Sequence, residues 1–335
     1  MKRTASFFLA LALAFSITAC TAPAEKADGG KLQIVTTLFP YYDFARAIAQ
    51  DRADVTLLLS PGREAHSFEP TPLDAATISE ADVFLYNGGE GEYWVESMLD
   101  AAGENIAVVA RMMDYVDALN EEYVEGMQGA DGHDHDHEHG SHDDHDHDHE
   151  EDEHDSDEIE YDEHIWTSPK NAVVLCRAVC GAICRADAEN AAFYRANCEN
   201  YCAQLEDLDA RFSALCESAP RRLLIFADRF PMLYFCREYG LDYRAAFHGC
   251  SGDTEPSLAT IKFLIDKVED ENIPVVYTID FGTKKVAAVV SECTGAAIET
   301  LYSMQTVSRA DFDAGETYLT LMERNFEALR KGLNA

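Results

Sequence analysis

Residues 32–60 read LQIVTTLFPYYDFARAIAQDRADVTLLLS, which is a short apolar run, an amphipathic stretch and a second apolar run. The β-branched, apolar segments predict strands at 32–38 and 53–60, and the amphipathic spacing between them predicts a helix at 42–50. The alternation continues with helices predicted at 73–80 and 92–102 and strands at 82–86 and 105–110. This order is typical of a parallel sheet covered by helices.

The same pattern restarts in the second half of the chain, with strand-like segments at 222–227, 241–247, 274–280 and 297–302. Between the halves, residues 188–218 contain no Gly or Pro and carry apolar side chains at three- and four-residue intervals, which predicts one helix of roughly eight turns. We therefore predict an α/β protein with two parallel-sheet lobes joined by one long, rigid helix. The expected boundaries are 31–186 for the first lobe, 187–218 for the linker helix and 219–335 for the second lobe.

The charge of the chain is strongly negative, with 62 Asp+Glu against 26 Lys+Arg among 335 residues and a net charge of −36. Such a balance argues against nucleic acid as a partner, because phosphate binding needs a basic face. It also argues against charge-driven binding to an anionic membrane. Half of the excess lies in residues 131–163, which hold 18 Asp+Glu, no Lys or Arg, and nine of the twelve His.

The first 19 residues, MKRTASFFLALALAFSITA, have a basic start and a short apolar stretch, which is typical of a secretory signal peptide. The ending ITAC resembles a bacterial lipobox, which implies that Cys20 is lipidated; the alternative is an ordinary signal peptide with a coincidental cysteine. Residues 20–30 are small and polar and are interpreted as a tether. We expect an extracytoplasmic protein, at the cell surface or in the periplasm, held at the membrane only by its lipid anchor.

Nine cysteines remain beyond Cys20, an odd number for an exported protein. Cys176, Cys180 and Cys184 fall on one helical face, and Cys198 and Cys202 repeat this spacing. They could form a thiolate metal site, or they could be small buried apolar side chains. We favour the second interpretation.

The His- and acid-rich run cannot bury a core, so we predict a disordered loop at about 128–160 inserted in the first lobe. Imidazoles alternating with carboxylates favour many weak, exchanging metal sites. The accessory ligands expected there are His133, His135, His137, His139, His142, His145, His147, His149 and His154. A segment without fixed structure is a poor place for a tight site, because ordering it costs conformational entropy.

Three histidines lie outside this run, and two of them occur in distinctive motifs. His66 lies in PGREAHSFEPTP (61–72), and His164 lies in DEHIWTSP (162–169). Together with VTTLFPYYDFARAI (35–48), an NG pair at 87–88, the His-rich insertion and the long helix, these motifs occur in an order that resembles the cluster A-I family of substrate-binding lipoproteins. Members of that family supply zinc or manganese to ABC importers. The resemblance extends from residue 32 to the end of the sequence.

The resemblance implies a metal site in the cleft between the lobes, with His66 and His164 as its first two ligands. Chemistry agrees, because a zinc site needs preformed N and O ligands, in a tetrahedral set. Carboxylates or carbonyls are expected to contact the far ring nitrogens, and Glu69 and Asp162 are the candidates.

The second lobe departs from the family pattern. Ala227 stands where the family usually has its third ligand, a histidine. Asp228 could replace that ligand, or it could cap the following helix. Asp280, after a later predicted strand, is the expected fourth ligand, and His248 is an alternative third imidazole.

The resemblance therefore implies a solute receptor, not an enzyme, that binds a divalent cation and passes it to an ABC permease driven by an ATPase. A ligand set of two imidazoles and two carboxylates would favour manganese or iron, whereas the His-rich loop favours zinc. We expect Zn²⁺, with Mn²⁺ as the alternative. We also expect the protein to be a monomer. A zinc hydrolase is a competing class, for which Glu64 or Asp228 could act as the base, but the sequence has no HExxH or GxSxG motif. An adhesin is a third class, for which nothing in the sequence supplies a binding module.

Overall fold

The computed structural model of the chain describes residues 30–63, 67–127, 160–249 and 255–334. A four-stranded parallel sheet of order β2-β1-β3-β4 forms the centre of the N-terminal lobe. Its strands are β1 (Leu32–Thr36), β2 (Ala53–Leu57), β3 (Val83–Tyr86) and β4 (Val108–Arg111). The helices of this lobe are α1 (Phe39–Ala49), α2 (Pro72–Ser79), α3 (Val95–Ala102) and α4 (Pro169–Ala186), with short 3₁₀ turns η1 (Gln50–Arg52), η2 (Glu90–Glu92), η3 (Gly103–Asn105), η4 (Met112–Tyr115) and η6 (Ile165–Thr167).

The C-terminal lobe repeats this plan with a parallel sheet of order β6-β5-β7-β8. Its strands are β5 (Leu223–Phe230), β6 (Asp242–His248), β7 (Val275–Ile279) and β8 (Ala297–Leu301). Its helices are α6 (Leu233–Tyr239), α7 (Leu258–Asp270), α8 (Lys285–Thr294), α9 (Arg309–Ala314) and α10 (Tyr318–Asn334).

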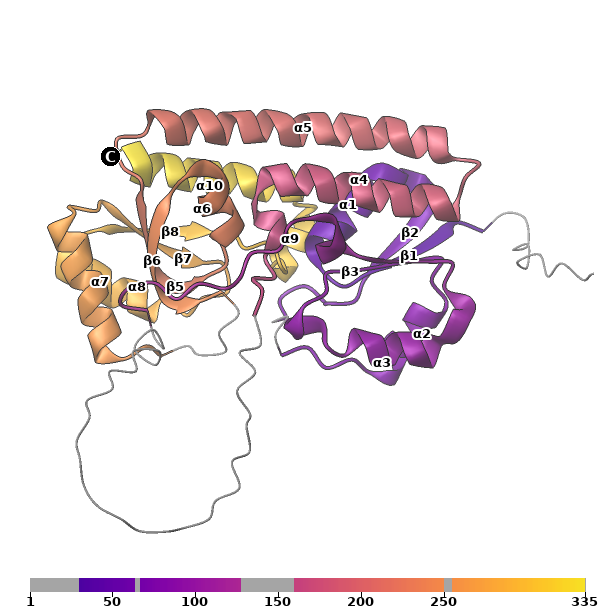
Figure 1. Cartoon of the computed structure of the whole chain (residues 1–335), viewed down its shortest axis with the longest axis horizontal. Helices are drawn as coiled ribbons and strands as arrows, with labels where there is room; N and C mark the ends of the chain where they lie inside the picture. The colour runs from indigo at the N-terminus through magenta and orange to yellow at the C-terminus, as the bar shows by residue number, and fades with distance from the viewer. Residues whose placement is uncertain (1–29, 64–66, 128–159, 250–254, 335) are drawn as a thin grey trace, which may run out of the picture. The chain divides into compact units, whose positions relative to one another are not determined.

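One long helix, α5 (Ala191–Ser218), runs along both lobes above α4 and α10 (Figure 1). It has 28 residues and follows α4 after a four-residue turn at 187–190. Its buried side chains repeat every three or four residues, and they include Cys198, Leu205 and Phe212. The prediction of two parallel-sheet lobes joined by one long helix is confirmed.

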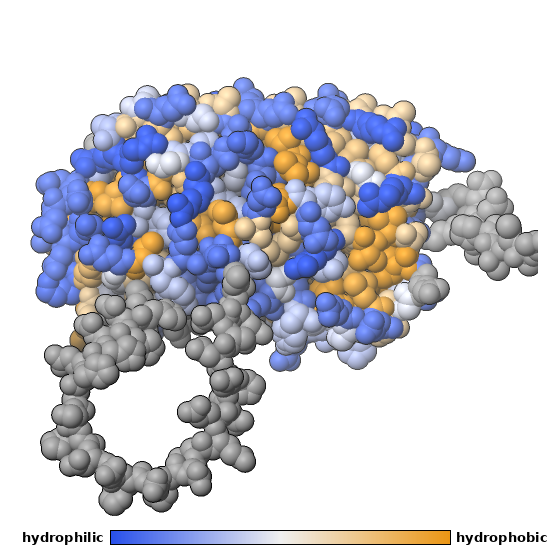
Figure 2. All heavy atoms as spheres, in the orientation of Figure 1, coloured by the Kyte–Doolittle hydropathy of each residue, from blue (hydrophilic) through white to orange (hydrophobic). Residues whose placement is uncertain are grey.

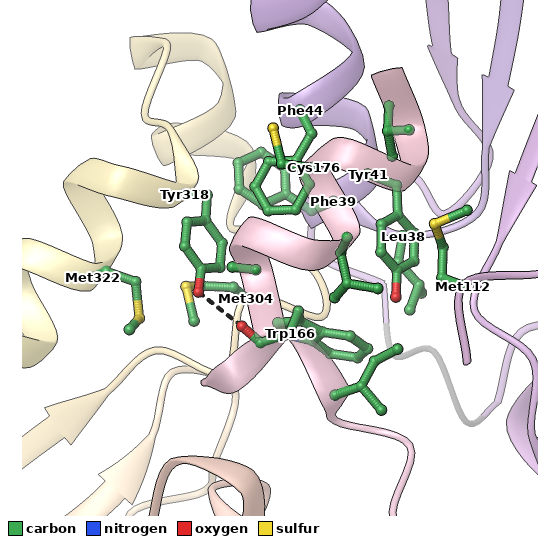
Figure 3. Close-up of a cluster of buried hydrophobic side chains, with 14 of the residues drawn as sticks. Leu38, Phe39, Tyr41, Phe44, Met112, Trp166, Cys176, Met304, Tyr318 and Met322 are labelled. Atoms are coloured by element: carbon green, nitrogen blue, oxygen red, sulfur yellow. Dashed lines mark hydrogen bonds between the residues drawn. The ribbon is translucent and has the colours of Figure 1, made fainter. Parts of the chain in front are cut away.

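A continuous apolar core connects the lobes, because residues 32–335 pack as one unit. Trp166 is fully buried; its indole nitrogen donates to the carbonyl of Ser303 (2.8 Å), and its own carbonyl accepts from the Tyr318 hydroxyl (2.7 Å). Figure 3 shows this contact between α10 and the chain just before α4, surrounded by buried aromatic and Met side chains. Tyr318 also packs edge-on against Phe44 of α1. These contacts oppose a wide hinge motion between the lobes, since opening would expose apolar side chains.

The predicted element boundaries differ from the structure by a few residues at several places. Strand β5 runs three residues beyond the predicted end at 227, with a register shift between Phe226 and Arg229 where it pairs with β6. Such a bulge bends a strand and redirects its side chains.

Among the described residues, no helix is long and apolar enough to cross a membrane. Hydrophilic side chains alternate with small apolar patches on the face displayed in Figure 2.

Candidate metal centre

His164 lies just before η6 and α4, and it is only 1% exposed to solvent. Its backbone N–H donates to Oδ1 of Asp162 (2.8 Å), and the same oxygen lies 3.2 Å from the ring nitrogen Nδ1. Burial lowers the pKa of His164, but Asp162, Glu163 and Glu121 raise it by more, so the net shift is upward. The expected contact of Asp162 with this imidazole is present. It fixes the orientation of the ring.

A pocket between the lobes contains His164. The other residues that line it come from the carboxyl ends of the strands of the C-terminal lobe and the segments that follow them, namely Arg229, Pro231, Gly249, Ile279, Phe281, Ser303, Gln305 and Thr306. Ligands commonly bind at this end of parallel sheets. At Gly249 a Cβ atom would lie 2.9 Å from the Phe230 carbonyl oxygen and 3.1 Å from the His164 ring. Glycine therefore allows this segment to approach the imidazole closely.

Asp228 lies inside β5, and its carboxylate is held by donors from the neighbouring strand β7 and from the next residue of β5. It accepts hydrogen bonds from the Thr278 hydroxyl (2.6 Å) and from the backbone N–H of Ile279 (3.3 Å) and of Arg229 (2.9 Å). Helix α6 begins five residues later and has no side-chain cap. The alternative that Asp228 caps the following helix is therefore wrong, because the bulged strand directs its carboxylate toward β7.

Asp280 follows β7. Together with Phe281 and Lys284 it lines another pocket, next to that of His164. Its Oδ1 accepts from the backbone N–H of Ser303 (3.2 Å), a residue that also lines the His164 pocket. Neither Asp228 nor Asp280 is among the described residues that line the His164 pocket itself.

His248, the last residue of β6, contacts a different group of side chains. Its Nδ1 pairs with the carboxylate of Glu121, and its ring lies 5.1 Å from that of Tyr123. Glu121, Glu160 and His248 each offer a ligand atom, and these atoms lie within 4.8 Å of one another. Sequence reasoning did not single out either glutamate.

A second pocket, at the carboxyl ends of the N-terminal strands, contains two buried glutamates that sequence reasoning also missed. Its described lining includes Leu59 and Phe68, on either side of the loop that carries His66, and it shares Gln305 with the His164 pocket. Glu92 accepts from the backbone N–H of Gly88 (2.8 Å), and Glu163 accepts from that of Gly91 (2.7 Å). Burial raises the pKa of Glu92 to about 7, and burial also raises the pKa of Glu163.

Several predicted residues fall outside the described residues. These are Cys20, Glu64, His66 and the nine histidines of the acid-rich run: His133, His135, His137, His139, His142, His145, His147, His149 and His154. Glu69, the candidate partner of His66, is described and exposed.

The cysteines of α4 and α5 face each other in the core. Cys176, Cys198 and Cys202 bring their sulfur atoms within 4.8 Å of one another. The Cys198 and Cys202 thiols lie 3.8 and 3.9 Å from the backbone carbonyl oxygens of Cys176 and Val173. Thiols that donate to carbonyls are neutral, and the eight described cysteines are free. These contacts favour the interpretation as buried small side chains over a thiolate site.

Comparison with known proteins gives consistent matches over nearly the whole chain. The family model described as zinc-uptake complex component A, periplasmic, matches residues 34–332. The high-affinity zinc uptake system protein ZnuA of Bacillus subtilis (strain 168) is 30% identical over 339 residues, which cover 99% of this chain and 98% of that protein.

Two solved structures share the fold. The metal-dependent lipoprotein YcdH of Bacillus subtilis matches with a TM-score of 0.72 and 30% identity, covering 90% of this chain and 100% of that one. The Zn(II)-bound ZnuA-like domain of Streptococcus pneumoniae AdcA matches with a TM-score of 0.71 and 25% identity, covering 91% and 100% of the two chains.

Proposed function

Since the chain belongs to the family of periplasmic zinc-uptake complex component A proteins, we propose that it captures Zn²⁺ outside the cytoplasmic membrane and delivers it to an ABC importer. The chain is a binding protein and not an enzyme. The ion is its cargo, bound without chemical change and then released.

The observation that carries this proposal is the environment of His164. A buried imidazole whose Nδ1 faces a carboxylate, as it does with Asp162, is the usual arrangement of a metal-binding histidine. It leaves Nε2 as the nitrogen to bind the ion. The position of the ring in a pocket between two sheets supports this role.

We propose that His66 supplies the second imidazole. The residues before and after its loop line the pocket that shares Gln305 with the His164 pocket. This neighbourhood supports a site to which both lobes contribute.

Asp228 and Asp280 are the proposed oxygen ligands of the second lobe, in place of the histidine that Ala227 cannot supply. Both carboxylates lie near strand ends and are held by hydrogen bonds from Thr278 and Ser303. Such bonds orient a carboxylate ligand. His248 is the alternative third imidazole, but its pairing with Glu121 and its position outside the described lining of the His164 pocket favour the two carboxylates.

The ion should leave through a local rearrangement of the ligands, because the buried contacts of Trp166 and helix α5 join the lobes firmly. We also propose lipidation at Cys20, a monomeric state, and delivery to a permease with its own ATPase. In this proposal the acid-rich run at 128–160 gathers ions weakly beside the tight site.

Calorimetric titration of the purified protein with Zn²⁺ and Mn²⁺ tests the proposal. We expect one tight zinc site that His164→Ala or His66→Ala abolishes, while His154→Ala, which removes one imidazole from the acid-rich run, leaves it unchanged. An unaltered tight site in both of the first two variants would overturn the assignment. A tighter site for Mn²⁺ than for Zn²⁺ would instead favour the manganese receptor.

A further inference from the structure

Three side chains outside the proposed zinc site converge from the described residues that flank the acid-rich run in the sequence and from the end of β6. Glu121 and Glu160 lie on neighbouring segments, since the backbone N–H of Glu121 donates to the carbonyl of Glu160 (2.9 Å) and Asn120 bridges to Tyr161. His248 comes from the end of β6. One ligand atom from each of the three residues lies within 4.8 Å of the other two.

The group is preorganised by its surroundings. The side chain of Glu121 is 2% exposed and that of His248 is 18% exposed. The ring of Tyr123 packs beside the imidazole at 5.1 Å. The segment that carries Glu121 is held on the C-terminal lobe, because the Tyr234 hydroxyl accepts from the backbone N–H of Leu119 (3.0 Å). Little ordering entropy would therefore be lost when an ion binds.

The charges of the group favour a cation. Two carboxylates and one imidazole carry a net negative charge whether the imidazole is neutral or protonated. Burial and the neighbouring carboxylates of Glu121 and Glu90 raise the pKa of Glu160. A divalent cation among these groups would offset both the repulsion between the carboxylates and the cost of their burial.

We propose that Glu121, Glu160 and His248 form a second divalent-cation site, distinct from the site of His164. Two oxygen ligands and one imidazole suit Zn²⁺ or Mn²⁺. Three protein ligands leave at least one coordination position open to water or to another side chain, so the ion can exchange. The inference needs only these three side chains and does not depend on the proposed function.

The second site lies next to the first in space. Gly249, which follows His248, approaches the ring of His164 so closely that a Cβ atom there would lie 3.1 Å from it. An ion bound at the second site would therefore lie beside the pocket of His164.

Anomalous diffraction from zinc-soaked crystals of the full chain tests the proposal directly. We expect a zinc peak about 2.0–2.2 Å from ligand atoms of the three side chains, separate from any peak at His164. Absence of a peak at this group in crystals that bind zinc elsewhere would overturn the proposal.

Zinc titration in solution provides the second measurement, in a His164→Ala background that removes the proposed primary site. We expect His248→Ala and Glu121→Gln each to weaken one binding event at least about tenfold, whereas the matched control Glu292→Gln, which alters an exposed carboxylate of α8, leaves that event unchanged. Unfolding temperatures measured without metal establish that each variant is folded.

Two outcomes would overturn the proposal. In one, adding His248→Ala or Glu121→Gln to the His164→Ala variant leaves its zinc titration unchanged. In the other, His248→Ala in the otherwise unmodified protein abolishes the single tight zinc site, which would make His248 a ligand of the primary ion. Neither outcome affects the test of the primary site with His164→Ala.

Discussion

Replacing Glu92 by Gln should make the metal-free protein less sensitive to rising pH. Glu92 is buried beside the carboxylate of Glu163, and burial raises its pKa from 4.5 to about 7. Below pH 4.5 the group is protonated in both the folded and the unfolded protein, so its full contribution to stability is present. As the pH rises through 7 the folded protein must ionise a buried carboxylate, and that stability is lost.

The size of the effect follows from the two pKa values. The difference between 4.5 and about 7, at 1.36 kcal/mol per pKa unit, corresponds to a loss of about 3 kcal/mol in the free energy of unfolding. In the variant an amide replaces the carboxyl group, so this loss does not occur. Gln also retains an oxygen that can accept from the backbone N–H of Gly88.

Urea denaturation between pH 4.5 and pH 8, in the presence of a chelator, measures the effect. At each pH, the unfolding free energy of the unmodified protein is subtracted from that of Glu92→Gln. We expect this difference to rise by about 3 kcal/mol between pH 4.5 and pH 8. Glu90→Gln is the matched control, because Glu90 is exposed in the same turn. Titrating groups that do not interact with Glu92 cancel in the comparison. A difference that stays constant with pH would refute the reasoning.

Three further predictions concern metal binding and the core. Asp162→Asn should weaken zinc binding by about 10- to 100-fold in a competition titration, because the ring of His164 loses its carboxylate partner; an unchanged affinity would contradict the role of Asp162. Gly249→Ala should also weaken zinc binding, since its Cβ would press on the His164 ring; a crystal structure with an unmoved ring and full affinity would contradict this. Trp166→Phe should lower the free energy of unfolding by about 1–3 kcal/mol in urea, because it leaves the Ser303 carbonyl without its donor; a loss below about 0.5 kcal/mol would argue against that contact.

The fold could be predicted from the sequence because each lobe is built from local patterns. The alternation of apolar runs with amphipathic stretches gives the strands and helices, and the long segment without Gly or Pro gives α5. The contact of Trp166 with Tyr318 could not be predicted in this way, since the two residues lie 152 positions apart and neither carries a local signal for the other.

The site could be predicted only where a motif is distinctive. His164 and Asp162 are two residues apart in a recognisable segment, and their contact follows from that spacing. Glu92, Glu121 and Glu163 gave no signal, because one glutamate among 62 acidic residues looks like any other. Their burial distinguishes them, and burial depends on tertiary packing. Asp228 was ambiguous for a similar reason, since a bulge inside β5 decides where its carboxylate points.

The position of α10 has a consequence for the order in which the chain can fold. The backbone N–H at the start of this helix, on Tyr318, donates to the carboxylate of Asp43 in α1 across 275 residues of sequence (3.0 Å), and Asp43 also accepts from Tyr201 of α5. A growing chain therefore cannot complete the packing around α1 until residues 318–334 have emerged. Until then the apolar faces of α1 and α5 stay partly uncovered, and exposed apolar surface of this kind favours association with other chains.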